Sequence, residues 1–219
     1  MTPRLPSLFT TADFSEAELC ALVLDGTLYR VGDCFCVIDE HPSAALRARS
    51  LALVLPDRLI AERHTAAWVW GALPDPPASH HVCVDIRSRV RPPGSRRLIV
   101  REVVISDAET VEFAGIRVTT PLRTAIDLAR SVGDFVDADI TVVAWLMRIG
   151  QLTVDGCAAA MDTRRNLPNK KLALTRLENS ASRAEQLPVA EEPLAADPLA
   201  VPPLERYGAT ALTGYDARN

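Results

Sequence analysis

The side chains that most readily suggest binding chemistry are arginines gathered in the middle of the chain. Between positions 87 and 101 the arginines are Arg87, Arg89, Arg91, Arg96, Arg97 and Arg101. Each guanidinium can donate two hydrogen bonds in one plane, which suits the oxygens of a phosphate group. Pro92-Pro93-Gly94 predicts a loop at the centre of this run, and such a loop would bring its two halves close together. An acidic protein partner or plain solvation would suit the run equally well, and the sequence leaves these alternatives open.

Other chemically capable side chains do not form a recognisable catalytic or metal-binding motif. Cys34 and Cys36 lack a second cysteine pair to complete a zinc site, so we interpret them as small buried side chains. His80 and His81 are adjacent in an expected strand and point to opposite faces, so they cannot serve one site. No glycine-rich phosphate loop and no nucleophile motif is present. We therefore predict a protein that is not an enzyme, with no cofactor, no metal and no small-molecule substrate.

Two pairs of side chains are interpreted as structural. Arg123 and Asp127 lie four residues apart on a helix that Thr120 caps, so they can form an ion pair across one turn. Trp68 and Trp70 lie two residues apart on a short helix, which places them about 200° apart around its axis. We therefore expect at most one of these tryptophans to face the main core. The carboxylates at positions 137 and 139 have no evident partner.

The composition is that of a folded chain with an uneven charge distribution. The chain has 219 residues, of which 48% are hydrophobic, and a net charge of −4. No apolar run approaches the roughly 20 residues that span a bilayer, and the start lacks a signal-peptide pattern, so we predict a cytoplasmic protein. Residues 1–40 hold seven acidic and two basic side chains, whereas residues 41–101 hold four acidic and ten basic ones. One basic patch could therefore meet a polyanion such as promoter DNA.

The elements that must position these residues predict an α+β fold. Ser15 and Glu18 form a capping box ahead of a helix over Glu16–Leu24. Two strands at 27–31 and 34–38 follow, joined by a two-residue turn. Further helices are expected at 43–54, 64–70, 120–130, 135–149, 153–161 and 170–185. Further strands are expected at 81–86 and 98–105, which we expect to pair with each other, and a hairpin over 111–118. From residue 187 repeated prolines predict a disordered tail.

Three passages resemble the AbiEi family of type IV antitoxins. They are SEAELCALVLDGTLYRVGDCFCVI, ERHTAAWVWGALP and GIRVTTPLRTAIDLAR, and the likeness covers about residues 8–185. The resemblance implies an N-terminal winged helix that binds promoter DNA. It also implies a following α/β domain linked to neutralising a nucleotidyltransferase-like toxin. We accordingly expect a winged-helix remnant at 1–40, an AbiEi-like domain at 41–186 and the tail at 187–219.

The N-terminal element departs from that family in ways that bear on DNA binding. One helix precedes the expected wing, so the winged helix is truncated, and this helix carries Glu16 and Glu18 but no Lys or Arg. Arg30 is the only cation of the wing and joins the six central arginines as a candidate nucleic-acid contact. Two hypotheses follow. One is a non-catalytic antitoxin or transcriptional regulator that binds DNA, protein or both; the alternative is a protein-interaction module that has lost DNA binding.

Overall fold

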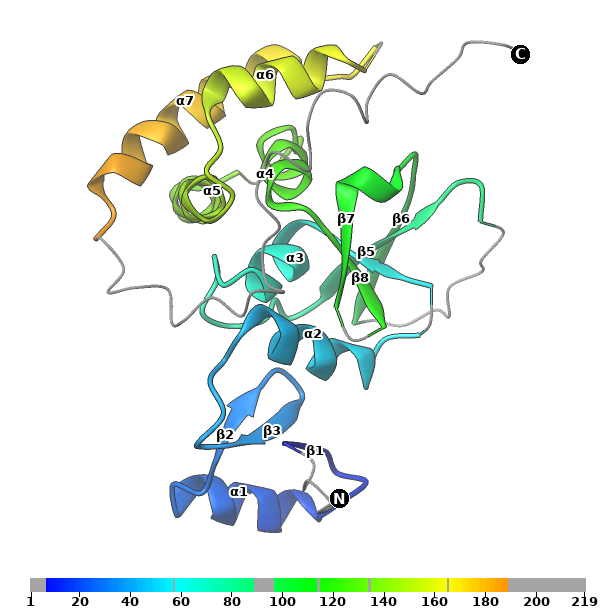
Figure 1. The fold of residues 1–219 in the computed structure, drawn as a ribbon, viewed down its shortest axis with the longest axis vertical. Helices are drawn as coiled ribbons and strands as arrows, with labels where there is room; N and C mark the ends of the chain where they lie inside the picture. Colours follow the sequence, from blue (N-terminus) through cyan, green and yellow to red (C-terminus); the bar gives the residue numbers. More distant parts are fainter. Residues whose placement is uncertain are drawn as a thin grey trace.

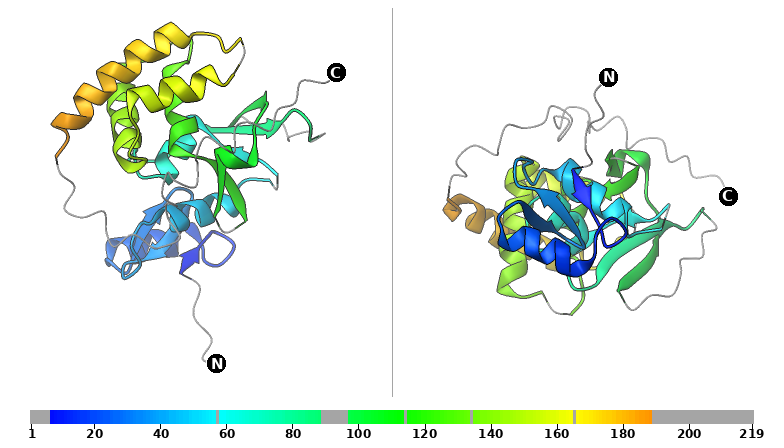
Figure 2. Two further views of the ribbon diagram at one scale, coloured as in Figure 1. Left: turned by 45° about the horizontal axis from the view of Figure 1, so that its top comes forward. Right: turned by 90° about the horizontal axis from the view of Figure 1, so that it is seen from below.

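The protein has an α+β architecture in which two sheets lie at different levels of the molecule (Figure 1). The computed structural model describes residues 7–56, 58–88, 97–113, 115–133, 135–164 and 166–188. Nearly all of the expected tail and the centre of the basic loop lie outside these residues. A small sheet with one helix lies at one end, a five-stranded sheet lies in the middle, and a group of helices covers the other end (Figure 2). The expected fold class is confirmed.

The N-terminal element is a three-stranded sheet crossed by one helix. Its strands are β1 (Leu8–Phe9), β2 (Leu28–Val31) and β3 (Cys34–Val37), in the order β1-β3-β2, and its helix is α1 (Glu16–Leu24). The capping box is confirmed, because the Ser15 hydroxyl accepts from the Glu18 amide and the Glu18 carboxylate accepts from the Ser15 amide. Leu19, Leu28 and Phe35 form a small core of their own. The two-residue β1 was missed because it is too short to show a period.

This small sheet is joined to the rest of the molecule by packing as well as by the chain. Helix α2 (Ala44–Ala52) follows β3 and contacts the next helix, α3 (Arg63–Val69). Gly32, at the turn between β2 and β3, has a φ of +61° and lies so close to α3 that a Cβ there would be 3.3 Å from the Trp68 ring. Glycine is therefore required at this turn both for its conformation and for its small size.

The central sheet combines parallel and antiparallel strands. Its strands are β4 (Ile60–Ala61), β5 (His80–Asp85), β6 (Leu98–Val103), β7 (Thr110–Phe113) and β8 (Ile116–Thr119), in the order β6-β5-β4-β8-β7. The expected hairpin is confirmed as β7 and β8. The pairing of β5 with β6 is also confirmed, but it is parallel, with His80 opposite Leu98 and Asp85 opposite Val103. The end of β5 and the start of β6 therefore lie at opposite ends of this strand pair.

The helices pack around α4 (Pro121–Ala129), nearly all of whose residues are buried. A short 3-10 turn, η1 (Asp107–Glu109), precedes β7. The remaining helices are α5 (Asp137–Ile149), α6 (Val154–Asp162) and α7 (Lys170–Gln186). Helix α4 lies between α3 and this outer group (Figure 1). Within the part of the chain that the structure describes, no helix is long and apolar enough to cross a bilayer.

The two tryptophans correct one expectation. Trp68 is 2% exposed and Trp70 is 6% exposed, and both belong to the main core. The expectation that at most one would face the core is wrong because α3 is covered on two sides. The N-terminal turn packs on Trp68, whereas the ring of Phe113 from the sheet meets Trp70 edge-on at 5.4 Å. The Trp70 indole also donates to the carbonyl of Thr119 at 2.8 Å.

We expect Trp70→Phe to lower the free energy of unfolding by about 1–3 kcal/mol, because the buried Thr119 carbonyl loses a donor. Urea unfolding followed by circular dichroism measures this change. Trp145→Phe is the matched control, since Trp145 is only partly buried and its ring contacts the Arg148 guanidinium. Equal effects of the two substitutions would show that the hydrogen bond adds nothing to ring burial.

Candidate functional site

A buried ion pair on α4 is the centre of the largest polar network in the described residues. The Nε of Arg123 donates to the Asp127 carboxylate at 2.8 Å, and these side chains are 6% and 4% exposed. The pair was predicted from the spacing of the two residues and is confirmed. Local sequence sets its position, because the Thr120 hydroxyl accepts from the Arg123 amide and Pro121 occupies the first helical position.

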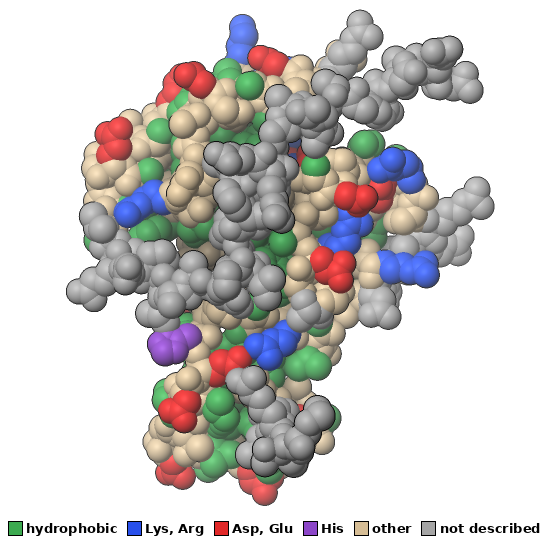
Figure 3. Space-filling view, in the orientation of Figure 1, with side chains coloured by type: hydrophobic (Ala, Val, Ile, Leu, Met, Phe, Trp, Pro, Cys, Tyr) green, Lys and Arg blue, Asp and Glu red, His purple; other side chains and the backbone are tan. Residues whose placement is uncertain are grey.

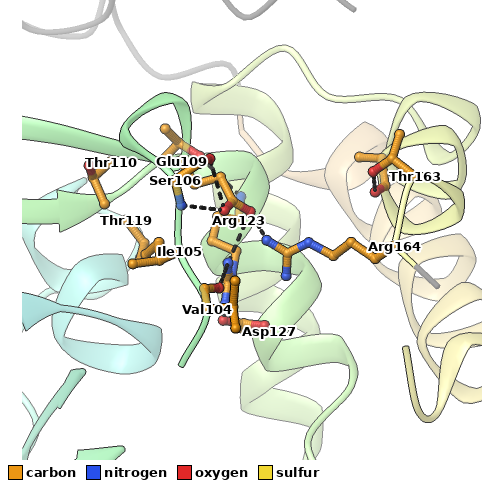
Figure 4. A network of polar contacts seen from close by, with 12 residues as sticks. Val104, Ile105, Ser106, Glu109, Thr110, Thr119, Arg123, Asp127, Thr163 and Arg164 are labelled. Carbon is orange, nitrogen blue, oxygen red and sulfur yellow. Dashed lines mark hydrogen bonds and ion pairs between the residues drawn. The ribbon is translucent and has the colours of Figure 1, made fainter. Parts of the chain in front are cut away.

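The same arginine reaches a second carboxylate outside the helix (Figure 4). Its Nη1 donates to Glu109 at 2.9 Å, and Arg164, which follows α6, pairs with the same oxygen of Glu109. The second oxygen of Glu109 accepts from the amide and the hydroxyl of Ser106. Glu109 therefore ties the turn before β7 to α4 and to the outer helices. This contact was not predicted, because its partners are 14 and 55 residues apart.

A third carboxylate lies at the start of α3 and binds an arginine of the sheet. Arg101 on β6 donates to both oxygens of Glu62, at 2.7 and 2.6 Å, and its Nη2 lies 3.5 Å from Asp127. Glu62 is 1% exposed. Arg130 adds a further contact to Asp127, at 3.2 Å. Three arginines from two elements thus surround the Asp127 carboxylate.

A histidine and an aspartate form a second polar unit. The Nε2 of His64 lies 2.6 Å from the Asp139 carboxylate, which also accepts from the Val136 amide at 3.0 Å. The earlier interpretation that Asp139 has no partner is therefore wrong; the two residues are 75 positions apart, so spacing gave no signal. The ring of His81 meets that of His64 edge-on at 5.3 Å. Burial, with the neighbouring cations, lowers the pKa of His81 to about 4.

The arginines at positions 87–101 do not come together into the one phosphate-binding group that the sequence predicted. Because β5 and β6 are parallel, Arg87 and Arg97 lie beyond opposite ends of these strands, about 20 Å apart. Arg87 contacts Asp85 and the carbonyl of Ile105. Arg97 lies 3.3 Å from Asp33 in the N-terminal turn. The expectation that the loop brings these two arginines together is wrong.

The other arginines predicted to contact nucleic acid differ in what they contact and in how far they are buried. Arg101 belongs to the buried network, and the guanidinium of Arg30 lies 5.2 Å from the centre of the Phe35 ring. Arg89, Arg91 and Arg96 lie outside the described residues. On the face shown in Figure 3, the Lys and Arg side chains lie beside Asp and Glu instead of gathering in one field. Nucleic-acid binding by these seven arginines stays a prediction.

The cysteines and the cavity beside Glu109 offer packing surfaces, not a catalytic or metal site, within the described residues. Cys34 and Cys36 are buried as expected, and the described residues contain no group of three or more possible metal ligands. Burial beside Glu62 raises the pKa of the Cys83 thiol far above its usual value. A cavity next to Glu109 has mainly apolar walls from α4, from α6 and from the segment that follows α6. Its charged lining residues, Glu109, Arg123 and Arg164, are paired with one another.

Comparisons with known proteins find a family match for one part of the chain. Residues 59–165 match a family model described as the AbiEi antitoxin C-terminal domain. No curated protein matches the chain. Among solved structures, the crystal structure of the RV2827C protein from Mycobacterium tuberculosis is 14% identical. The similarity covers 83% of this chain and 75% of that chain, with a TM-score of 0.45. The matched segment contains Glu62, Arg101, Glu109, Arg123, Asp127 and Arg164.

We expect Asp127→Asn to destabilise the protein by about 3–5 kcal/mol, because it leaves three arginines around a neutral side chain. Asp137→Asn on the next helix is the matched control. Asp137 is 78% exposed in its pair with Arg183, so the expected loss is below about 1 kcal/mol. Thermal and urea unfolding of both variants measures the difference. Similar melting curves would contradict the central structural role of Asp127.

Proposed function

We propose that the chain is the antitoxin of a type IV toxin–antitoxin system, because residues 59–165 match the model of the AbiEi antitoxin C-terminal domain. In this proposal it counteracts a nucleotidyltransferase-like toxin in the cytoplasm by binding and has no catalytic activity of its own. The observation that carries the proposal is the family match of residues 59–165. The same segment contains most of the ion pairs that hold α3, α4 and β6 together, so the matched residues share one packed network.

The surface charge of the N-terminal element favours protein contacts over DNA contacts. Helix α1 carries Glu16 and Glu18 in its first turn and has no basic residue in its last turn. A helix that reads DNA needs basic or amide side chains near phosphates and base edges, and an acidic helix repels them. We therefore propose that residues 1–40, a truncated winged helix, contact a protein, and that residues 41–186 form the antitoxin domain.

A DNA-binding role remains as the second candidate function because cations lie at several places on the sheet. Arg87 and Arg97 flank the parallel pair β5 and β6, and three further arginines occupy the connecting segment. Binding through such scattered cations depends on phosphate contacts, which release counterions and carry no sequence information. This version of the proposal is a regulator that binds promoter DNA weakly beside its antitoxin role.

We expect co-expression of the full chain to restore growth of bacteria that produce a nucleotidyltransferase-like toxin encoded beside its gene. Colony counts with and without induction measure the rescue. The Asp137→Asn chain should rescue like the parent. The Asp127→Asn chain should lose rescue in proportion to its loss of folded protein, because Asp127 holds the antitoxin domain together. Absence of rescue by a soluble, folded parent chain would refute the antitoxin proposal for that toxin.

We expect the affinity for a promoter fragment to be weak and to fall by orders of magnitude as salt rises, because such binding rests on counterion release. Alanine replacement of Arg87, Arg89, Arg96 and Arg97 should abolish it in a fluorescence-anisotropy titration. Arg30→Ala is the comparison, since it removes the cation of the wing alone. Tight binding that survives the fourfold replacement but not Arg30→Ala would mean that the N-terminal element reads DNA.

A further inference from the structure

Arg63, the first residue of α3, carries a guanidinium whose Nε the surrounding residues do not satisfy. It follows Glu62 directly and has a φ of +47°, a conformation that L-residues other than glycine seldom adopt. Its Nε is buried and has no hydrogen-bond partner. Among the ion pairs of the described residues none includes Arg63, whereas Glu62 is taken up by Arg101. Burial lowers the pKa of Arg63, and the positive charge of Arg101 lowers it further.

The charges around Arg63 leave a positive excess in the partly buried network. Three carboxylates (Glu62, Glu109 and Asp127) face five arginines (Arg63, Arg101, Arg123, Arg130 and Arg164). The excess is therefore two positive charges. The His64–Asp139 pair adds no net charge when His64 is protonated and one negative charge when His64 is neutral, so a positive excess is left in either state. An excess of positive charge in partly buried surroundings is unfavourable, so an added anion would stabilise this part of the structure.

His81 gives an independent sign of the same positive field. Its Nδ1 is a second buried nitrogen without a hydrogen-bond partner. Burial is the main cause that lowers its pKa to about 4, and the neighbouring guanidinium groups of Arg63 and Arg101 lower it further. A histidine beside unpaired carboxylates would show the opposite shift. Arg63 and His81 thus bring two unsatisfied nitrogens to one cluster between α3 and the edge of the sheet.

We propose that Arg63, Arg101, Arg130 and His81 form a binding site for a phosphate group. A phosphate anion balances this positive excess, and its oxygens accept hydrogen bonds from several guanidinium groups at once. The site opens to solvent along Arg101 and His64, whose side chains are each 31% exposed. Because the Nε of Arg63 and the Nδ1 of His81 are buried, a compact phosphate suits these donors better than the backbone of a DNA duplex does. The ligand is inorganic phosphate or the phosphate group of a nucleotide. This binding function goes beyond the antitoxin proposal.

The test is a calorimetric titration of the full chain with inorganic phosphate, and separately with adenosine monophosphate, at an ionic strength held constant with sodium chloride. Arg63→Gln should raise the dissociation constant at least about tenfold, the equivalent of about 1.4 kcal/mol. Arg58→Gln is the matched control, because Arg58 also has a positive φ of 70° but is exposed. Tighter binding of the nucleotide would identify a nucleotide as the source, and tighter binding of inorganic phosphate would identify the free anion.

Thermal melting keeps the proposal testable through a second readout. Without phosphate, Arg63→Gln should melt at or above the temperature of the parent, because a partly buried charge of the sign already in excess is removed. Phosphate should raise the melting temperature of the parent and of Arg58→Gln but leave that of Arg63→Gln unchanged. If Arg63→Gln does not fold, Arg63→Lys replaces it. Lysine keeps the positive charge but lacks the planar guanidinium that donates two hydrogen bonds, so this variant should bind phosphate more weakly. A parent that responds to phosphate no more than to chloride, or an Arg63 variant that binds like the parent, overturns the proposal.

Discussion

The carboxylate of Asp127 is the point on which the arrangement of the central elements depends. It is 4% exposed and receives Arg123 from one turn earlier on the same helix, Arg130 from the end of that helix and Arg101 from the sheet. A buried carboxylate requires such partners, because an uncompensated charge in the interior is strongly unfavourable. Helix α4 can therefore bury nearly all of its residues only where β6 supplies Arg101 and the turn before β7 supplies Glu109 for Arg123.

This requirement explains why neighbouring elements take the positions they do. Thr120 and Pro121 begin α4 directly after β8, so the helix starts at a fixed distance from the sheet. The hydroxyls of Thr119 and Thr124 lie 2.7 Å apart across that junction. The carbonyl of Thr119 accepts from Trp70. The passages around residues 62–74 and 115–130 therefore meet in space, and their polar residues bind one another as well as their own helices.

How much of this could be predicted depended on how far apart the partners lie in the sequence. The capping box of α1 and the Arg123–Asp127 pair involve residues three or four positions apart, and both were predicted and are confirmed. The hairpin of β7 and β8 followed from local turn and strand patterns. The Glu62–Arg101 and His64–Asp139 contacts join residues 39 and 75 positions apart. Such contacts depend on the order and direction of strands, which a single sequence does not encode in its spacing.

The parallel pairing of β5 and β6 changes how an arginine-rich sequence is to be understood. An antiparallel pair would have placed the two ends of the basic run side by side, as a polyanion site requires. The parallel pair separates Arg87 from Arg97 and turns Arg101 inward to Glu62. Arginines that are close in the sequence therefore contact three different carboxylates in three parts of the structure. The concentration of positive charge then lies in a partly buried network whose carboxylates are too few for its arginines. Charge counted along a chain therefore indicates a polyanion surface only when the strand direction keeps the counted residues on one face.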